Sequence, residues 1–171
     1  MIISLLSLTG ELNHRITQTN KIRNQLIMAE TLGMLCDKIT IVKLKQFHTE
    51  DSVRLKSLEQ QSSQLQQEID EYLFNAITGK IPVERLSFAS NKVFKQEGNE
   101  IGEITGDIGN LVYKLAEVNC LLWHEQEKVY EFETVPADEK DKVVKQLAVL
   151  NLQRNKCIDS INQNLAEMIS K

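Results

Sequence analysis

The stretch that decides the fold reads IGEITGDIGNLVYKLAEVNCLLWHEQEKVYEF and covers residues 101–132. Its apolar residues recur at alternating steps of three and four, which is the spacing of one helix face and of a heptad seam. The pattern is interrupted only at Glu125. A helix of this length is about 45 Å long, because each residue adds about 1.5 Å. Glycines at helical spacing near its start leave two alternatives, a close helix contact or an irregular beginning.

A short break follows this segment, and a second helical pattern begins behind it. Thr134 is a candidate helix cap, and Pro136 fits the first turn of a helix. Asp138 and Glu139 would complement the dipole of that helix. Two long helices joined by a short turn must run antiparallel. We therefore expect a helical hairpin over residues 101–170.

An earlier part of the chain has the same organisation. Apolar residues at steps of three and four predict one helix that ends near His48 and a second that stops at Gly79. The polar residues 49–52 separate them, which gives a second hairpin over about residues 28–79. Another helix is expected from Met1 to about Gln25, and residues 81–99 are expected to connect the hairpins with one short helix.

The predicted fold is thus all-α, a single domain of residues 1–171. It is an elongated antiparallel helical bundle of two long hairpins plus an N-terminal helix. The 7 glycines and 2 prolines among 171 residues leave room for long helices and argue against a β-sandwich or barrel. A hydrophobic fraction of 42% is too high for a disordered chain.

Composition also bounds the setting and the partners of the protein. The formal charge of -4 argues against a nucleic-acid partner, because phosphate neutralisation needs a basic face. The apolar run at residues 1–8 is too short to span a membrane and lacks the features of a signal peptide. The 3 cysteines form no C-x-x-C pair, which is typical of reduced thiols in a cytoplasmic protein.

Several polar residues fall on the apolar stripes of the second hairpin. Folding it about its turn brings Glu117 and Asn119 level with Arg154. We predict a Glu117–Arg154 ion pair flanked by Asn119, Asn151 and Asn155, because a buried charge without a partner is costly. Two interpretations remain open. The layer fixes the register of the helices, or it forms a polar pocket for a small ligand.

Two H-x-x-[DE] pairs, His48 with Asp51 and His124 with Glu127, would each share one helix face. Carboxylate-bridged metal bundles use these residue types in the reverse order and with further glutamates. Surface pairing or helix capping explains both pairs more simply, so no metal site is predicted. Trp123 is expected to anchor the core with its N–H satisfied.

Acidic residues at positions 97, 100, 103 and 107 form another cluster. Helical pyrophosphohydrolases hold magnesium with E-x-x-E and E-x-x-D pairs on facing helices, but the second pair is missing here. A solvated acidic face is the simpler account. The sequence contains no phosphate loop, nucleophile elbow or zinc spacing, and we predict no cofactor.

Two groups of residues resemble the ordered motifs of all-helical bacterial families that carry a domain-of-unknown-function label. The first is LCDKITIVKLKQFH at residues 35–48, which resembles a "cDKlsIL-LKi-H" signature. The second combines residues 116–124 with residues 150–159, which together resemble "vN-xLWh-ED…lN-qRN-xiD". Gln126 departs from the pattern, because the families usually have a carboxylate there.

This resemblance implies a helical bundle in the bacterial cytoplasm and a link to surface-polysaccharide genes such as those of glycosyltransferases. It supplies no catalytic residues. It does draw attention to Asp37, Lys45 and His48, which share one helix face at steps of eight and three. Together with the layer of Asn119 and Arg154, this face is where a ligand is expected.

For function we favour a non-catalytic accessory or binding protein that acts through protein contacts or a small polar ligand. One alternative is an enzyme, a metal-dependent hydrolase or a sugar-nucleotide enzyme with its site inside the bundle. Another is a structural protein that self-associates through its heptad seams, for example as a homodimer. The candidate ligand-binding residues are Asp37, Lys45, His48, Glu117, Asn119, Trp123, His124, Glu127, Asn151, Arg154 and Asn155.

Overall fold

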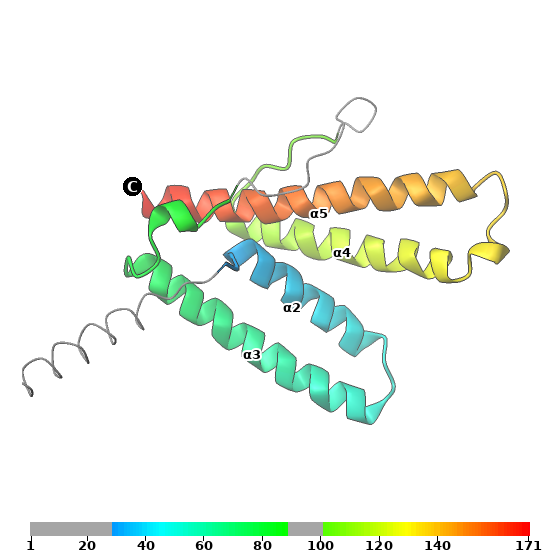
Figure 1. The fold of residues 1–171 in the computed structure, drawn as a ribbon, viewed down its shortest axis with the longest axis horizontal. Coiled ribbons are helices and arrows are strands. Elements are labelled where there is room, and N and C mark those ends of the chain that lie inside the picture. The colour runs from blue at the N-terminus through cyan, green and yellow to red at the C-terminus, as the bar shows by residue number, and fades with distance from the viewer. Residues whose placement is uncertain (1–28, 89–100) are drawn as a thin grey trace, which may run out of the picture.

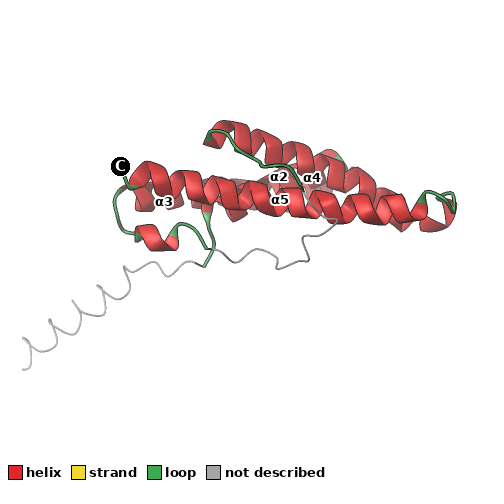
Figure 2. Ribbon diagram, turned by 90° about the horizontal axis from the view of Figure 1, so that it is seen from above, coloured by secondary structure: helices red, strands yellow, loops and turns green. Residues whose placement is uncertain are grey.

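The computed structural model describes residues 29–88 and 101–171. The helix predicted at the N-terminus lies outside these residues. Within them the chain forms helices and loops and no strand (Figures 1 and 2). The elements in order are α2 Leu32–Phe47, α3 Ser52–Ile77, the 3-10 turn η1 Val83–Arg85, α4 Ile108–Tyr130, the 3-10 turn η2 Phe132–Thr134 and α5 Lys140–Ile169.

The helices form two antiparallel hairpins, as predicted. Helix α2 packs along α3, and α4 packs along α5 (Figure 1). The short helix α2 also contacts both α4 and α5, so it joins the two hairpins. After α3 the chain turns back, and η1 packs against α5. The all-α bundle expected from the sequence is therefore confirmed.

The ends of the first hairpin follow from local chemistry. Helix α2 ends at its C-cap residue His48. Asp51 is the N-cap of α3, and its side chain accepts hydrogen bonds from the backbone amides of Val53 and Arg54. Helix α3 ends before Gly79, whose φ of 70° is the left-handed conformation that glycine adopts without strain. These ends agree with the prediction.

Helix α4 begins later than the heptad pattern suggested. Residues 101–107 are not helical, and the helix starts at Ile108 instead of Ile101. Gly106 has a φ of 146°, which a helix cannot accommodate, and Asp107 caps the helix by accepting from the amide of Asn110. Of the two alternatives for the glycine-rich start, the irregular one is found. Ile104 still packs against the core from this segment.

The predicted cap of the last helix was wrong. Thr134 lies in η2, and its hydroxyl donates to the backbone oxygen of Glu131 instead of capping α5. Pro136 precedes the first turn of α5, which starts at Lys140 after Glu139. Glu139 occupies the N-cap position of α5, so Thr134, five residues earlier in the chain, is not its capping residue.

The core lies where α2 crosses the second hairpin and where α3 covers α2. Leu35, Leu115 and Ile161 are fully buried there. Gly33 allows α2 to approach α5, because a Cβ at this position would lie 2.4 Å from the backbone oxygen of Ile158. The amide of Gly33 also donates to Asn162 Oδ1 at 2.8 Å. This close crossing positions the polar residues of the next turn of α2.

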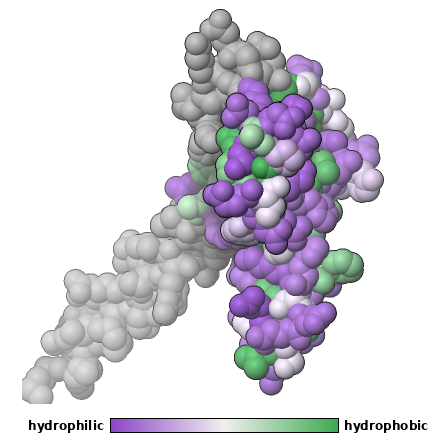
Figure 3. All heavy atoms as spheres, turned by 90° about the vertical axis from the view of Figure 1, so that its right-hand side faces the viewer, coloured by the Kyte–Doolittle hydropathy of each residue, from purple (hydrophilic) through white to green (hydrophobic). Residues whose placement is uncertain are grey.

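Viewed along the long axis, the end that carries the α4–α5 turn and the α2–α3 turn is largely hydrophilic with scattered apolar side chains (Figure 3). None of the helices in residues 29–88 and 101–171 is both long and apolar enough to cross a membrane.

Candidate functional site

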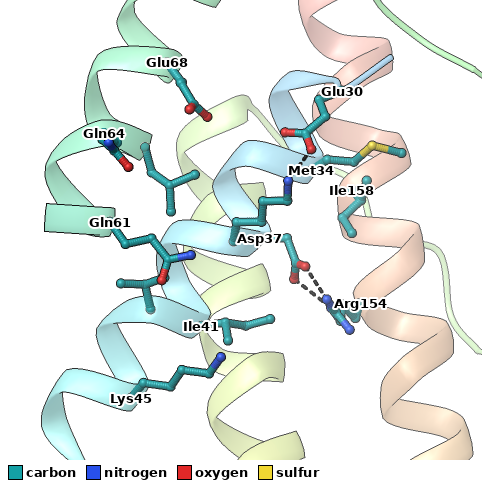
Figure 4. A pocket seen from close by; sticks show the side chains of 13 residues that line it. Glu30, Met34, Asp37, Ile41, Lys45, Gln61, Gln64, Glu68, Arg154 and Ile158 are labelled. Atoms are coloured by element: carbon teal, nitrogen blue, oxygen red, sulfur yellow. Dashed lines mark hydrogen bonds and ion pairs between the residues drawn. The ribbon is translucent and has the colours of Figure 1, made fainter. Parts of the chain in front are cut away.

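A buried carboxylate lies at the junction of α2, α4 and α5. Asp37 on α2 is 5% exposed, and Arg154 on α5 binds both of its oxygens, with Nε 2.7 Å from Oδ1 and Nη2 on Oδ2 (Figure 4). Asn119 on α4 donates to Asp37 Oδ1 at 2.9 Å. Its amide nitrogen also lies 2.7 Å from the hydroxyl oxygen of Thr40.

The arrangement satisfies charges that would otherwise be costly to bury. Two side chains donate to the carboxylate of Asp37, and Thr40 donates to its backbone oxygen at 2.8 Å. Charge-assisted bidentate pairs of arginine and carboxylate are among the stronger hydrogen bonds in proteins. Hydrogen bonding to Asp37 raises the pKa of Arg154, so the guanidinium stays charged. The network fixes α2 against the second hairpin.

The predicted Glu117–Arg154 ion pair was wrong. Arg154 pairs with Asp37 of the other hairpin, 117 residues away in sequence. Glu117 is exposed and pairs with Lys114 on its own helix at 2.6 Å, and this hydrogen bond raises the pKa of Lys114. Glu117 lies on the outer side of α4, whereas Asn119 faces inward. Intrahelical register alone could not identify the partner on α2.

The asparagines predicted beside this pair have different roles. Asn119 belongs to the network, as expected. Asn151 donates to the backbone oxygen of Leu147 in its own helix at 2.9 Å. Asn155 is partly buried on the next turn of α5.

A groove of about 540 Å³ runs along α2 between α3 and α5, and Asp37 and Arg154 line it (Figure 4). Lys38 pairs with Glu30 at one end. The remaining polar side chains of the groove make no hydrogen bond or ion pair with any other described residue. They are Lys45 on α2 and Gln61, Gln64 and Glu68 on α3. Met34, Ile41, Val42, Leu65 and Ile158 supply the aliphatic surface.

A second hollow of about 440 Å³ continues from Lys45 toward the end of α2. The ring of His48 stacks on Trp123 of α4, with centroids 4.8 Å apart and an interplanar angle of 16°. Lys45 lines both hollows, and Arg54 lies on the wall of the second. The predicted face of Asp37, Lys45 and His48 thus borders two hollows that share Lys45 as a lining residue.

The two histidine–carboxylate pairs differ in the structure. His48 ends α2 while Asp51 caps α3, so they do not share a helix face as predicted, because a loop separates them. His124 and Glu127 do share one, with Nδ1 3.3 Å from Oε2.

Trp123 donates from Nε1 to Glu127 Oε1 at 2.8 Å. Its N–H is satisfied as predicted, but its ring is only partly buried and stacks on His48 instead of anchoring the core. The hydrogen bond from Trp123, followed by that from His124, lowers the pKa of Glu127. This carboxylate therefore stays ionised beside the two rings.

The described residues contain no group of three or more His, Cys, Asp or Glu side chains that could hold a metal ion. Of the acidic cluster noted in the sequence, positions 97 and 100 lie outside the described residues. Asp107 caps α4, and Glu103 is exposed.

Comparison with known proteins found no match for this chain. No protein-family model matches the chain, and neither a curated protein nor a solved structure is significantly similar to it. The family resemblance noted in the sequence therefore stays a prediction.

Proposed function

We propose that the chain is a non-catalytic binding protein whose groove along α2 takes a small polar ligand rich in hydroxyl groups, such as a sugar unit. The observation that carries this proposal is the set of polar side chains in the groove that bind no other described residue. Lys45 supplies a cationic donor, Glu68 an anionic acceptor, and Gln61 and Gln64 supply amides.

The charge balance of the groove favours a neutral or zwitterionic ligand. Lys38 is neutralised by Glu30, and Arg154 by Asp37. One ammonium, one carboxylate and two amides remain, which provide donors and acceptors with no net charge. A nucleotide or other polyanion needs a cationic cradle, which this groove does not supply.

The size and walls of the groove also fit a ligand of this kind. Its volume of about 540 Å³ lies within the range of roughly 300–1,000 Å³ that is common for small-molecule sites. Partly exposed aliphatic side chains such as Met34 and Ile41 offer the C–H faces of a sugar an apolar surface. The resemblance to bacterial families linked to surface-polysaccharide genes supports the same ligand class and a bacterial, cytoplasmic setting.

The test is a calorimetric titration of the purified protein with a neutral hexose, an amino sugar and a uronic acid. A Lys45→Ala variant should bind the preferred sugar about 10- to 150-fold more weakly, because a hydrogen bond to a charged group contributes about 1.5–3 kcal/mol. Gln61→Ala should weaken binding less. Lys43→Ala is the matched control, because Lys43 lies on the same helix, binds Gln46 alone among the described residues and does not line the groove.

The proposal fails if none of the three sugars binds with a dissociation constant below about 10 mM. It also fails if Lys43→Ala weakens binding as much as Lys45→Ala does. Sedimentation of the same sample tests the alternative of self-association. If the chain forms a homodimer, the measured mass should rise to twice that of the monomer as the protein concentration increases. The described residues provide no ligand cluster for the alternative of a metal-dependent hydrolase.

A further inference from the structure

The three cysteines of the chain lie in different environments. Cys36 and Cys157 are buried, and burial raises the pKa of each thiol to about 11. Such thiols are protonated at neutral pH and therefore poor nucleophiles. Cys120 on α4 is partly exposed. The chain thus carries two inert thiols beside one that small molecules can reach.

Cys120 is the first member of a line of side chains along the outer side of α4. Its Sγ lies 3.8 Å from Nε2 of His124 one turn further on. Nδ1 of that ring lies 3.3 Å from Oε2 of Glu127. Steps of four and three place all three on one helix face. Trp123 donates to the other oxygen of the same carboxylate at 2.8 Å, which fixes its position.

We propose that Cys120 is a nucleophilic thiol, activated by His124, that forms mixed disulfides with small cationic disulfides. A cysteine next to a histidine that is oriented by a carboxylate is a general arrangement for activating a thiol. Cys120 is partly exposed and the side chain of His124 is 54% exposed, so a reagent reaches the pair from solvent. None of Cys120, His124 and Glu127 lines the groove along α2.

The reaction balances without any further reagent. His124 Nε2 accepts the proton of the Cys120 thiol, and the thiolate attacks one sulfur of the disulfide. A new S–S bond forms to Cys120, while the S–S bond of the reagent breaks. The sulfur of Cys120 is oxidised and the leaving sulfur is reduced. The leaving thiolate takes the proton from the imidazolium, which restores neutral His124.

The preferred charge of the co-reactant follows from a hollow of about 750 Å³ that His124 borders; Cys120 lies beside this hollow, one helical turn before His124, and does not line it. Residues of the α4–α5 turn also line it. Three carboxylates line it, from Glu127, Glu131 and Glu139, against one ammonium, from Lys128. Its field therefore attracts cations and repels anions.

The test is the rate of mixed-disulfide formation on the full-length protein, with the modified cysteine located by peptide mass spectrometry. The reagents are cystamine, which is dicationic, and dithiodiglycolate, which is dianionic. We expect modification at Cys120 alone, and a rate with cystamine at least tenfold above that with dithiodiglycolate at low salt. His124→Gln should lower the cystamine rate about tenfold or more. Gln126→Ala, an exposed change on the same helix, is the matched control and should not alter it.

Each outcome decides a part of the proposal. Equal rates for wild type and His124→Gln would overturn the activation by His124. Modification of Cys36 or Cys157 as fast as that of Cys120 would overturn the selectivity. Equal rates for the two reagents would overturn the role of the acidic hollow. A thermal melt of each variant shows that it is folded, and the half-exposed position of His124 predicts that it will be.

Discussion

Replacing Asp37 by alanine tests the role of the buried network directly. The substitution removes the carboxylate that Arg154 and Asn119 bind. Arg154 then loses both hydrogen bonds to its partner, whereas Asn119 keeps its contact with Thr40. The expected result is a less stable protein with the same helices, because α2 still packs against the second hairpin through Leu35 and Gly33.

The expected loss in the free energy of unfolding depends on how deeply the Asp37–Arg154 pair is buried. Breaking a buried ion pair costs about 3–5 kcal/mol when the remaining charge is fully buried. The side chain of Arg154 is 30% exposed, so its guanidinium regains part of its hydration. We therefore expect Asp37→Ala to lower the free energy of unfolding by about 2–3 kcal/mol. For a chain of this length that corresponds to a fall in Tm of about 4 to 12 °C.

Urea denaturation followed by circular dichroism measures this change. Glu117→Ala, which removes an exposed ion pair, is the control and should cost less than about 1 kcal/mol. The double variant Asp37→Ala/Arg154→Ala should be little less stable than Asp37→Ala alone, because the two residues act as one unit. A loss below about 1 kcal/mol for Asp37→Ala, or strictly additive losses in the double variant, would refute the reasoning.

Further stability predictions concern the helix crossing and a helix cap. Gly33→Ala should lower the free energy of unfolding by about 1–3 kcal/mol, because its Cβ would clash with the backbone of α5. Gly109→Ala should leave this free energy unchanged or raise it by up to about 1 kcal/mol. The denaturation midpoints of the two variants measure the difference. The backbone amides of Arg54 and Val53 lower the pKa of Asp51 below its ordinary value near 3.8. Ionised Asp51 therefore stabilises the fold above that pH, and this contribution is lost as the pH falls through the lowered pKa. Asp51→Ala should destabilise the protein at pH 7, and its difference from wild type should shrink in thermal melts below about pH 3.8.

Periodicity alone predicted the architecture correctly, because long amphipathic helices leave a repeated signal in the sequence. Short local signals were less reliable. Ile101 and Ile104 continue the heptad spacing of α4, yet the helix starts only at Ile108, because the backbone angle of Gly106 is not helical. The spacing of apolar residues does not record a backbone angle. Thr134 has the chemistry of a cap, but α5 begins only at Lys140, with Glu139 in the N-cap position.

The candidate site shows the same limit at longer range. The sequence singled out Arg154, Asn119 and Asp37, and the structure brings all three together. The sequence-based prediction paired Arg154 with the wrong carboxylate, because helical register relates residues within one hairpin only. Contacts between hairpins depend on how α2 crosses the other helices. The polar side chains of α3 in the groove were missed because glutamines on an exposed helix face give no signal in a single sequence.

The position of α2 between the hairpins has a consequence for the order of events when the chain is made. Arg154 follows Asp37 by 117 residues, whereas the contacts inside each hairpin join residues much closer in sequence. Closing long loops is slow compared with forming local helical contacts. At a synthesis rate of about 5–20 residues per second, Arg154 is synthesised about 6 to 23 s after Asp37. During this interval the first hairpin exists without the ion pair that later fixes it to the second hairpin.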